Sequence, residues 1–243
     1  MFKIPASFLV FLAFANLPAS SQPAETAVVE VFVSQNCPAC PKAHENLDQL
    51  SETVPRFLQL TWSVNYWDYL GDADDMAIPE SAFRQRVYAE KMALRGPYTP
   101  QVVVNGVHQT AGNQRRSVKN LLIDAVDDGA MGTVTLDFAD GIVSVSGPAT
   151  LAEADVLLLD VETVERNGQN LRNAVTHISE LGIWAGEDFA TPASCSSRCV
   201  LLVQEVGCGP IFAALEITPK AENPGHTKVL LKPQPAGAGP GEQ

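Results

Sequence analysis

The residues of this chain best suited to chemistry are two cysteines separated by two residues, in Cys37-Pro38-Ala39-Cys40. Such a pair can close into a small disulfide ring, and a helix that begins at the pair stabilises a thiolate at its first cysteine. Cys37 would attack a substrate disulfide to form a mixed disulfide, and Cys40 would then displace the product. The same spacing supplies half of a zinc site, so the sequence around the pair must decide between redox chemistry and metal binding.

The elements predicted on either side of the pair favour redox chemistry. A β-rich run at 26–34 (TAVVEVFVS) precedes it, an amphipathic helix follows it, and a second strand-like run, LQLTWSV, occupies 58–64. This order predicts a βαβ start, with the cysteines between the first strand and the first helix. The chain also contains no second Cys-x-x-Cys that would complete a four-ligand site.

The pattern continues with a helix-like run, SAFRQRVYAEKMAL, and then PQVVVNGVHQTAG, in which Asn105-Gly106 between two apolar runs predicts a β-hairpin. A last helix is predicted at about 116–127. This order of elements resembles the thioredoxin fold. In proteins of that fold a cis-proline before the third strand packs against the cysteine pair, and the neighbouring backbone pairs with the substrate. Thr99 and Pro100 occupy the matching positions here.

From about residue 131 the sequence changes to short strands with turn signals such as Asp140-Gly141, which predicts an antiparallel β-sandwich. The predicted fold class is therefore an α/β thioredoxin-like N-terminal domain at 26–130 plus an antiparallel β-sandwich-like C-terminal domain at 131–232. The Pro/Gly-rich end, 233–243, is predicted to be a disordered tail.

Composition limits the function classes. The chain has 243 residues, with 16 Lys plus Arg against 28 Asp plus Glu, and a formal net charge of -12. This charge disfavours nucleic acid and anionic membranes as partners, and the densest basic cluster is only Arg115, Arg116 and Lys119. Residues 1–21 are typical of a cleaved signal peptide, and no later stretch predicts an integral membrane segment. We expect a periplasmic or secreted protein, in a compartment where disulfides form.

Five segments together carry a resemblance to a known family: VVEVFVSQNCPACP, NYWDYLGD, FRQRVYAE, YTPQVVVNG and NLRNAVTHI. They are similar to the secreted thioredoxin-like bacterial family known as domain of unknown function 1223, over nearly the whole mature chain. The resemblance implies a thioredoxin fold with a β-rich C-terminal part, and it brings no established reaction. Members often have Gly before the first cysteine and Ser-Ser between the two, where this chain has Asn36 and Pro38-Ala39. The Cys-Pro-x-Cys form resembles glutaredoxins and periplasmic disulfide oxidases, and Thr before the proline resembles disulfide isomerases.

Three residues near the pair have both a functional and a structural interpretation. Glu30 is a candidate proton acceptor for Cys40, like the thioredoxin acid, but it lies one position further from the cysteines, which places it on the other strand face as an ordinary half-exposed residue. His44 is a candidate to lower a thiol pKa or bind copper; the alternative is a solvated helix histidine. Pro41 is expected to remove a helical hydrogen bond and bend the helix.

Other candidates lie further from the pair. Aromatic side chains could line a substrate groove or anchor the core and a loop: Trp62, Tyr66, Trp67 and Tyr69. Arg84 and Arg86 are expected to pair with the acidic run at 72–75. Among Cys195, Cys199 and Cys208, we expect one structural disulfide that includes Cys195, plus one spare thiol.

We predict an exported thiol-disulfide oxidoreductase with the site residues Cys37, Cys40, Thr99, Pro100 and Glu30. Cys37 attacks and Cys40 resolves; no cofactor and no metal site are expected. The expected partners are protein thiols or disulfides and an unidentified redox partner. Two alternatives stay open: a thioredoxin-fold module that holds a soft ion such as Cu(I) through Cys37, Cys40 and His44, and a binding protein whose cysteine pair is only structural.

Overall fold

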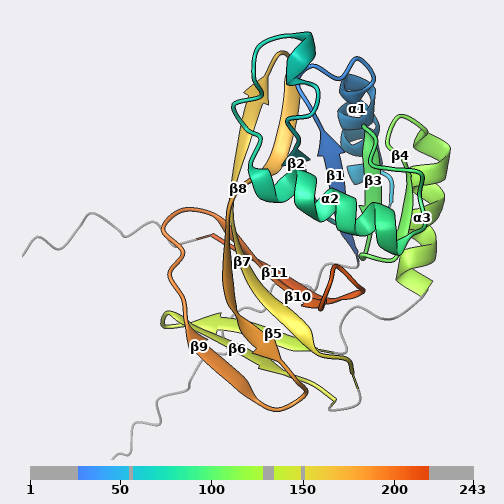
Figure 1. Ribbon diagram of the computed structural model, residues 1–243. Coiled ribbons are helices and arrows are strands. Elements are labelled where there is room, and N and C mark those ends of the chain that lie inside the picture. Colours follow the sequence, from blue (N-terminus) through green and yellow to red (C-terminus); the bar gives the residue numbers. More distant parts are fainter. Residues whose placement is uncertain (1–26, 55–56, 128–133, 149–150, 219–243) are drawn as a thin grey trace, which may run out of the picture.

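The structure is a computed structural model that describes residues 27–54, 57–127, 134–148 and 151–218 (Figure 1). The predicted signal peptide and the predicted tail lie outside these residues. The first half contains β1 (Val28–Val33), α1 (Cys40–Ser51), β2 (Leu58–Ser63), the 3-10 helix η1 (Asp68–Leu70), α2 (Pro79–Lys91), β3 (Gln101–Val104), β4 (His108–Ala111) and α3 (Arg115–Asp127). The second half contains β5 (Thr135–Ala139), β6 (Ile142–Ser146), β7 (Ala154–Arg166), β8 (Gln169–Trp184), β9 (Phe189–Pro192), β10 (Cys199–Glu205) and β11 (Ile211–Ile217). No helix of the described residues is long and apolar enough to cross a membrane.

The strands of the first half are arranged in the order β2-β1-β3-β4. β1 is parallel to β2, as the predicted βαβ start requires, and antiparallel to β3. Residues of β1 alternate between the two faces of the sheet, because successive strand side chains point in opposite directions. Val29, Val31 and Val33 pack with residues of α1 and α3, whereas Val28 and Phe32 pack with residues of α2. The sheet is therefore covered on both faces.

The predicted hairpin is confirmed. β3 and β4 are antiparallel, with Val104 opposite His108 and a three-residue turn between them. Asn105 and Gly106 both have positive φ angles, 50° and 71°, which Asn and Gly adopt at lower cost than other residues. The Asn105 side chain also accepts a hydrogen bond of 2.8 Å from the backbone N–H of Val28, so the turn is fixed to the start of β1.

The second half extends the same sheet. β8 adds to β2 in a parallel orientation, and the eight strands run in the order β11-β10-β7-β8-β2-β1-β3-β4 (Figure 1). One face of β7, β10 and β11 packs on a separate antiparallel sheet of order β5-β6-β9. The fold is thus mixed α/β, with one large mixed sheet and a second antiparallel sheet.

The predicted β-sandwich is found only in part. Two sheets do face each other in the second half, but the larger of them also contains the strands of the first half. The physical reason is that β2 would otherwise end the sheet and leave its backbone groups unpaired, and β8 pairs with it. The large sheet is continuous across residue 130. The division into two domains there stays a prediction.

The turns of the two halves also touch. The backbone N–H of Ile211 donates to the carbonyl of Asn105 at 2.9 Å. At Gly106 a Cβ atom would lie only 2.1 Å from the carbonyl oxygen of Gly209, so only glycine fits at this position without displacing the β10–β11 turn.

Candidate functional site

Cys37 and Cys40 form a disulfide, with their Cα atoms 5.4 Å apart. Cys37 lies in the turn after β1, and its backbone N–H donates to the carbonyl of Ser34 at 3.1 Å. Cys40 is the first residue of α1, and its N–H donates to the carbonyl of Cys37 at 3.1 Å. Both are buried, with Cys37 3% exposed and Cys40 0%. The sequence therefore predicted correctly that the pair lies between a strand and a helix.

The expected bend at Pro41 is wrong. Pro41 lies in the first turn of α1, and the helix continues without interruption to Ser51. The first N–H groups of a helix have no partner within the helix, so a proline there removes no hydrogen bond. No side chain caps this end, where Ala39 is the N-cap residue. The positive end of the helix dipole is therefore adjacent to the cysteine pair.

Pro100 lies beside the start of α1. The Thr99–Pro100 peptide bond is cis and directly precedes β3. Gly112, after β4, connects the proline to the helix: its N–H donates to the Pro100 carbonyl at 2.8 Å. A Cβ atom on Gly112 would lie 2.9 Å from the Cβ of Ala43 in α1 and 3.3 Å from that of Pro100. The structure thus brings Pro100 and the helix that carries Cys40 to one end of the sheet.

Of the four aromatic residues, Trp67 lies on the side of the sheet that carries the cysteine pair. Its indole N–H donates to the Thr99 hydroxyl at 2.7 Å, and its ring packs against the buried cluster that contains both cysteines. Trp67 also stacks on Tyr69, with ring centroids 6.4 Å apart. By contrast, Trp62 is fully buried in the core on the α2 side of the sheet. The Tyr66 hydroxyl bonds to Gln85, and burial raises the pKa of Tyr66 to about 12.

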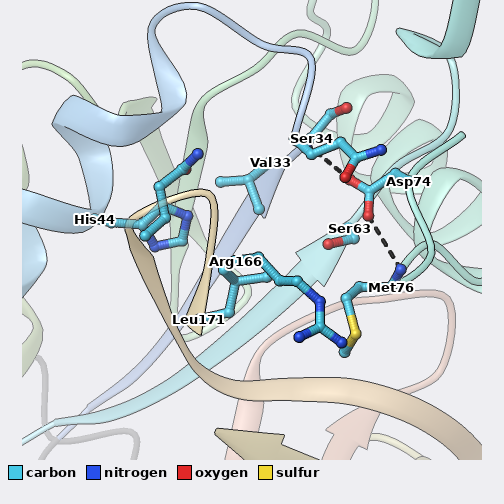
Figure 2. A pocket seen from close by; sticks show the side chains of 10 residues that line it. Val33, Ser34, His44, Ser63, Asp74, Met76, Arg166 and Leu171 are labelled. Carbon is cyan, nitrogen blue, oxygen red and sulfur yellow. Dashed lines mark hydrogen bonds between the residues drawn. The ribbon is translucent and has the colours of Figure 1, made fainter. Parts of the chain in front are cut away.

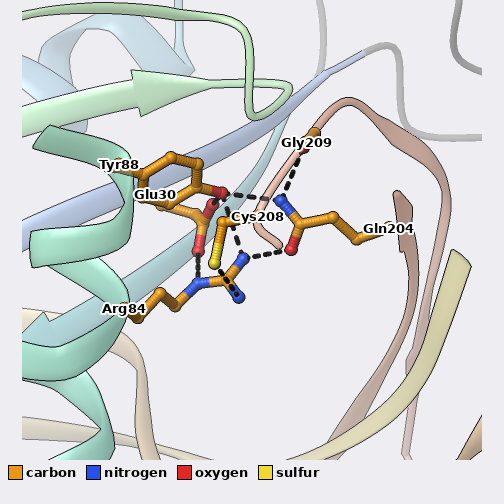
Figure 3. Close-up of polar contacts among 6 residues, drawn as sticks. All are labelled: Glu30, Arg84, Tyr88, Gln204, Cys208 and Gly209. Carbon is orange, nitrogen blue, oxygen red and sulfur yellow. Dashed lines mark hydrogen bonds and ion pairs between the residues drawn. The ribbon is translucent and has the colours of Figure 1, made fainter. Parts of the chain in front are cut away.

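Glu30 is not brought to the cysteines. It is fully buried on the α2 face of β1, whereas Cys37 and Cys40 pack on the face covered by α1 and α3. Its carboxylate accepts a hydrogen bond of 2.6 Å from Arg84 Nε and a second one from the Tyr88 hydroxyl (Figure 3). Both earlier expectations fail here: Glu30 is not a half-exposed strand residue, and Arg84 pairs with it rather than with the acidic run at 72–75.

Arg84 is the centre of a buried polar cluster that the sequence did not predict (Figure 3). Its guanidinium donates to Gln204 of β10 at 2.5 Å and lies 3.7 Å from the free thiol of Cys208. Burial by itself would lower the pKa of Arg84, but the charge of Glu30 outweighs this and raises it. Burial raises the pKa of the Cys208 thiol. The cluster therefore joins β1, α2 and the β10–β11 turn with charged and neutral hydrogen bonds.

His44 is buried, and the expectation of a solvated histidine is wrong. Its side chain is 3% exposed, and neither ring nitrogen has a hydrogen-bond partner among the described residues. Burial lowers the pKa of His44 to about 4, so the imidazole is neutral at pH 7. It lines a small cavity with side chains from β1, β2 and the β7–β8 hairpin (Figure 2): Val33, Ser63, Arg166 and Leu171.

The same cavity contains Asp74, whose carboxylate accepts backbone hydrogen bonds from Gln35 at 2.8 Å and Met76 at 3.1 Å (Figure 2). Burial raises the pKa of Asp74 in spite of these bonds. His44 does not join the two thiols in a ligand set: among the described residues, no three His, Cys, Asp or Glu side chains form a group that could hold a metal ion.

The second group of cysteines is as predicted. Cys195 and Cys199 form a disulfide with a Cα–Cα distance of 6.0 Å, and Cys208 is a partly exposed free thiol. Cys199 starts β10, so this disulfide fixes the loop that follows β9 to the edge of that strand.

Comparison with known proteins gives a family and a fold. A family model described as "Protein of unknown function (DUF1223)" matches residues 28–204. A crystal structure of a protein from Agrobacterium tumefaciens is similar, with 27% identity and a TM-score of 0.69, covering 85% of this chain and all of that one. HBP35 of Porphyromonas gingivalis shares the fold, with 16% identity and a TM-score of 0.59 over 86% of this chain and 80% of its own. No curated protein matches this chain.

Proposed function

The chain belongs to the DUF1223 family of proteins of unknown function, and we propose that it is an exported thiol-disulfide oxidoreductase whose Cys37–Cys40 pair exchanges with protein thiols or disulfides. The observation that carries the proposal is the disulfide ring at the first turn of α1, at the end of the sheet where Pro100 lies. A strand order of β2-β1-β3-β4, with α1 and α3 on one face and α2 on the other, supports a thioredoxin-like assignment for this half.

The oxidised pair accepts two electrons in two steps. A substrate thiolate attacks Cys37 Sγ, the Cys37–Cys40 bond breaks, and Cys40 leaves as a thiolate. A second substrate thiolate then attacks the substrate sulfur of the mixed disulfide, so that a substrate disulfide forms and Cys37 leaves as a thiolate. The reverse sequence reduces a substrate disulfide, with Cys37 as nucleophile and Cys40 as the resolving thiol. Which direction operates depends on the reduction potential of the pair relative to its partners.

The other predicted site residues differ in their position relative to the cysteine pair, and so in the role proposed for each. Thr99 and Pro100 directly precede β3, and Pro100 lies near Ala43 in the first turn of α1, so in this proposal they position a substrate backbone next to the pair. Glu30 is on the opposite face of the sheet and is held by Arg84, so it has no part in the proposed proton transfers. The positive end of α1 favours a thiolate at Cys37 over one deeper in the core.

The test is the reduction potential of the pair in a series of glutathione buffers. Each equilibrium mixture is quenched with an alkylating reagent, and the peptide that contains Cys37 and Cys40 is quantified by mass spectrometry, so that Cys195, Cys199 and Cys208 do not contribute. We expect a value between about -120 and -270 mV, the range of known exchange catalysts. A value below about -300 mV would identify an inert structural disulfide and contradict the proposal.

A second test uses the resolving cysteine. Cys40→Ser should trap mixed disulfides with exported proteins through Cys37, because the thiol that releases the product is missing. Cys37→Ser is the matched control and should trap none. Mixed disulfides absent from Cys40→Ser, or equally abundant in both variants, would count against the assigned roles. The exported setting is tested separately by the N-terminal sequence of the mature protein, which should begin near Gln22.

A further inference from the structure

We propose that residues 65–74, named here the cover segment, close over the Cys37–Cys40 disulfide, and that Trp67 is the positioning residue that holds the segment shut. The segment runs from the end of β2 through η1 (Figure 1). The inference rests on the proposed function in one respect, because a cover regulates exchange only if the pair exchanges. Whether the segment limits access to the disulfide is a separate question and has its own measurement.

Access to the disulfide is restricted in the folded protein. A thiolate must approach Cys37 Sγ directly, yet Cys37 is only 3% exposed. Trp67 packs against the buried cluster that contains Cys37 and Cys40, while the next residues of the cover segment face solvent, with Tyr69 78% and Leu70 54% exposed. The segment is therefore a surface segment with one large side chain turned inward, onto the core cluster to which the cysteines belong.

The first contact that holds the segment is on the proline side of the pair. The Trp67 indole N–H donates to the Thr99 hydroxyl at 2.7 Å. Thr99 precedes Pro100 and occupies the position where a substrate backbone is expected to pair. Closure of the segment therefore covers the disulfide and occupies the Thr99 side chain with the same indole, so a bound substrate and a closed segment compete for one place.

The second set of contacts is on the other side of the pair, at the two residues before Cys37. The Gln35 side chain donates to the carbonyls of Asp72 and Ala73 at 2.8 and 2.7 Å, and the Asn36 amide donates to the Asp72 carbonyl at 2.8 Å. Gly71 fits closely against Asn36, since a Cβ there would lie 2.6 Å from Asn36 Oδ1. The segment is thus tied both to Thr99 and to the two residues that precede Cys37.

The middle of the segment, between Tyr66 and Asp74, is held by few interactions, so it can open while Tyr66 and Asp74 keep their hydrogen bonds to Gln85 and to the Gln35 N–H. Its internal hydrogen bonds are local, from Asp68, Leu70 and Gly71 to carbonyls three residues earlier. Within 65–74 the residues form no strand pairing, and the nearest bridge, Ser63 to Ala77, lies outside it. A side-chain hydrogen bond adds about 1 kcal/mol to stability on average. Segments held in this way open locally without unfolding of the whole protein.

The experiment measures how fast dithiothreitol reduces the oxidised, full-length protein, with Cys37 alkylation followed by mass spectrometry. The two variants Trp67→Phe and Thr99→Val each remove one end of the Trp67–Thr99 hydrogen bond. Thr99→Val keeps the shape of the side chain, whereas Trp67→Phe keeps an aromatic ring but loses part of the indole's packing. We expect each to accelerate reduction roughly five- to tenfold. The double variant should be no faster than the faster single variant, because all three lack the same bond.

The control is Thr61→Val. Thr61 donates a hydrogen bond of the same length, 2.7 Å, to the Arg172 carbonyl, between β2 and β8. The Thr61→Val variant should have a lower free energy of unfolding in urea, and the rate at which dithiothreitol reduces its Cys37–Cys40 disulfide should change by no more than about twofold. The cover is refuted if Trp67→Phe and Thr99→Val reduce within twofold of the wild type, if their effects multiply in the double variant, or if Thr61→Val accelerates reduction as much as they do.

The two proposals fail separately. If both variants are reduced faster but the reduction potential of the Cys37–Cys40 pair is below about -300 mV, the cover-segment proposal holds and the oxidoreductase proposal is wrong. A potential in the catalytic range combined with unchanged rates would retain the oxidoreductase and discard the cover.

Discussion

His44 should make this protein sensitive to mild acid. The imidazole is 3% exposed and neither ring nitrogen has a partner among the described residues, so the folded state can accept a proton on it only at the cost of burying an unpaired charge. In the unfolded chain the same side chain is solvated and regains its ordinary pKa. Unfolding is therefore favoured at any pH where the unfolded chain binds this proton and the folded protein does not.

The size of the effect follows from the pKa values. Burial lowers the pKa of His44 from 6.5 to about 4, and one pKa unit corresponds to about 1.4 kcal/mol. The stability associated with the neutral imidazole is complete above pH 6.5 and is lost as the pH falls from 6.5 toward 4. Its loss reaches about 2 kcal/mol at pH 5 and about 3 kcal/mol at pH 4.

The assay is urea unfolding at pH 7.5 and pH 5 for the wild type and for His44→Gln, which cannot titrate. Asp74 lies in the same cavity and titrates in both proteins, so its contribution cancels in the comparison. We expect the wild type to lose about 2 kcal/mol more than His44→Gln between the two pH values. His177→Gln, an exposed position on β8, is the matched control and should behave like the wild type. A difference below about 0.5 kcal/mol between His44→Gln and the wild type would refute the reasoning.

Two further predictions concern the buried ion pair of Glu30 with Arg84 and the turn at Gly106. Glu30→Gln leaves Arg84 charged and buried without its anionic partner, so urea unfolding should show a loss of about 3–5 kcal/mol; a loss below 1 kcal/mol would mean that the remaining hydrogen bonds satisfy the guanidinium. Gly106→Ala should destabilise the protein more than Gly168→Ala, since both positions have φ near 70° but only at Gly106 would the new Cβ meet an atom, the Gly209 carbonyl oxygen at 2.1 Å. Gly168→Ala should cost only about 1–2 kcal/mol for its backbone conformation, and equal losses in urea would contradict the steric argument.

Prediction from the sequence succeeded where a feature depends on neighbouring residues. The Cys-Pro-Ala-Cys spacing fixed the small disulfide ring, and Asn105-Gly106 fixed the hairpin, because each depends on backbone conformations that a few adjacent residues prefer. The strand-helix-strand start was readable for the same reason. The rule that strand faces alternate also indicated that Glu30 points away from the cysteines; it does, which contradicts its inclusion among the predicted site residues.

Prediction was wrong where a side chain's environment comes from distant parts of the chain. A histidine in the middle of an amphipathic helix gives no local sign that the β7–β8 hairpin, more than 120 residues later, will close over it. Arg84 was expected to pair with the nearby acidic run, but its carboxylate partner is 54 residues away and its amide partner, Gln204, is 120 residues away. Similarly, a strand-rich second half does not reveal that β8 will pair with β2 and extend the first sheet.

The sequence by itself therefore determined the cysteine pair, the local elements around it and the family. The tertiary structure alone decided how accessible that pair is, since Cys37 is only 3% exposed in the folded chain and Trp67 reaches Thr99 across 32 residues of chain. It also decided which charges are buried and paired. The physical reason is that spacing and local propensity act within one turn of a helix or one hairpin, whereas burial and ion pairing depend on which distant segments the folded chain brings into contact.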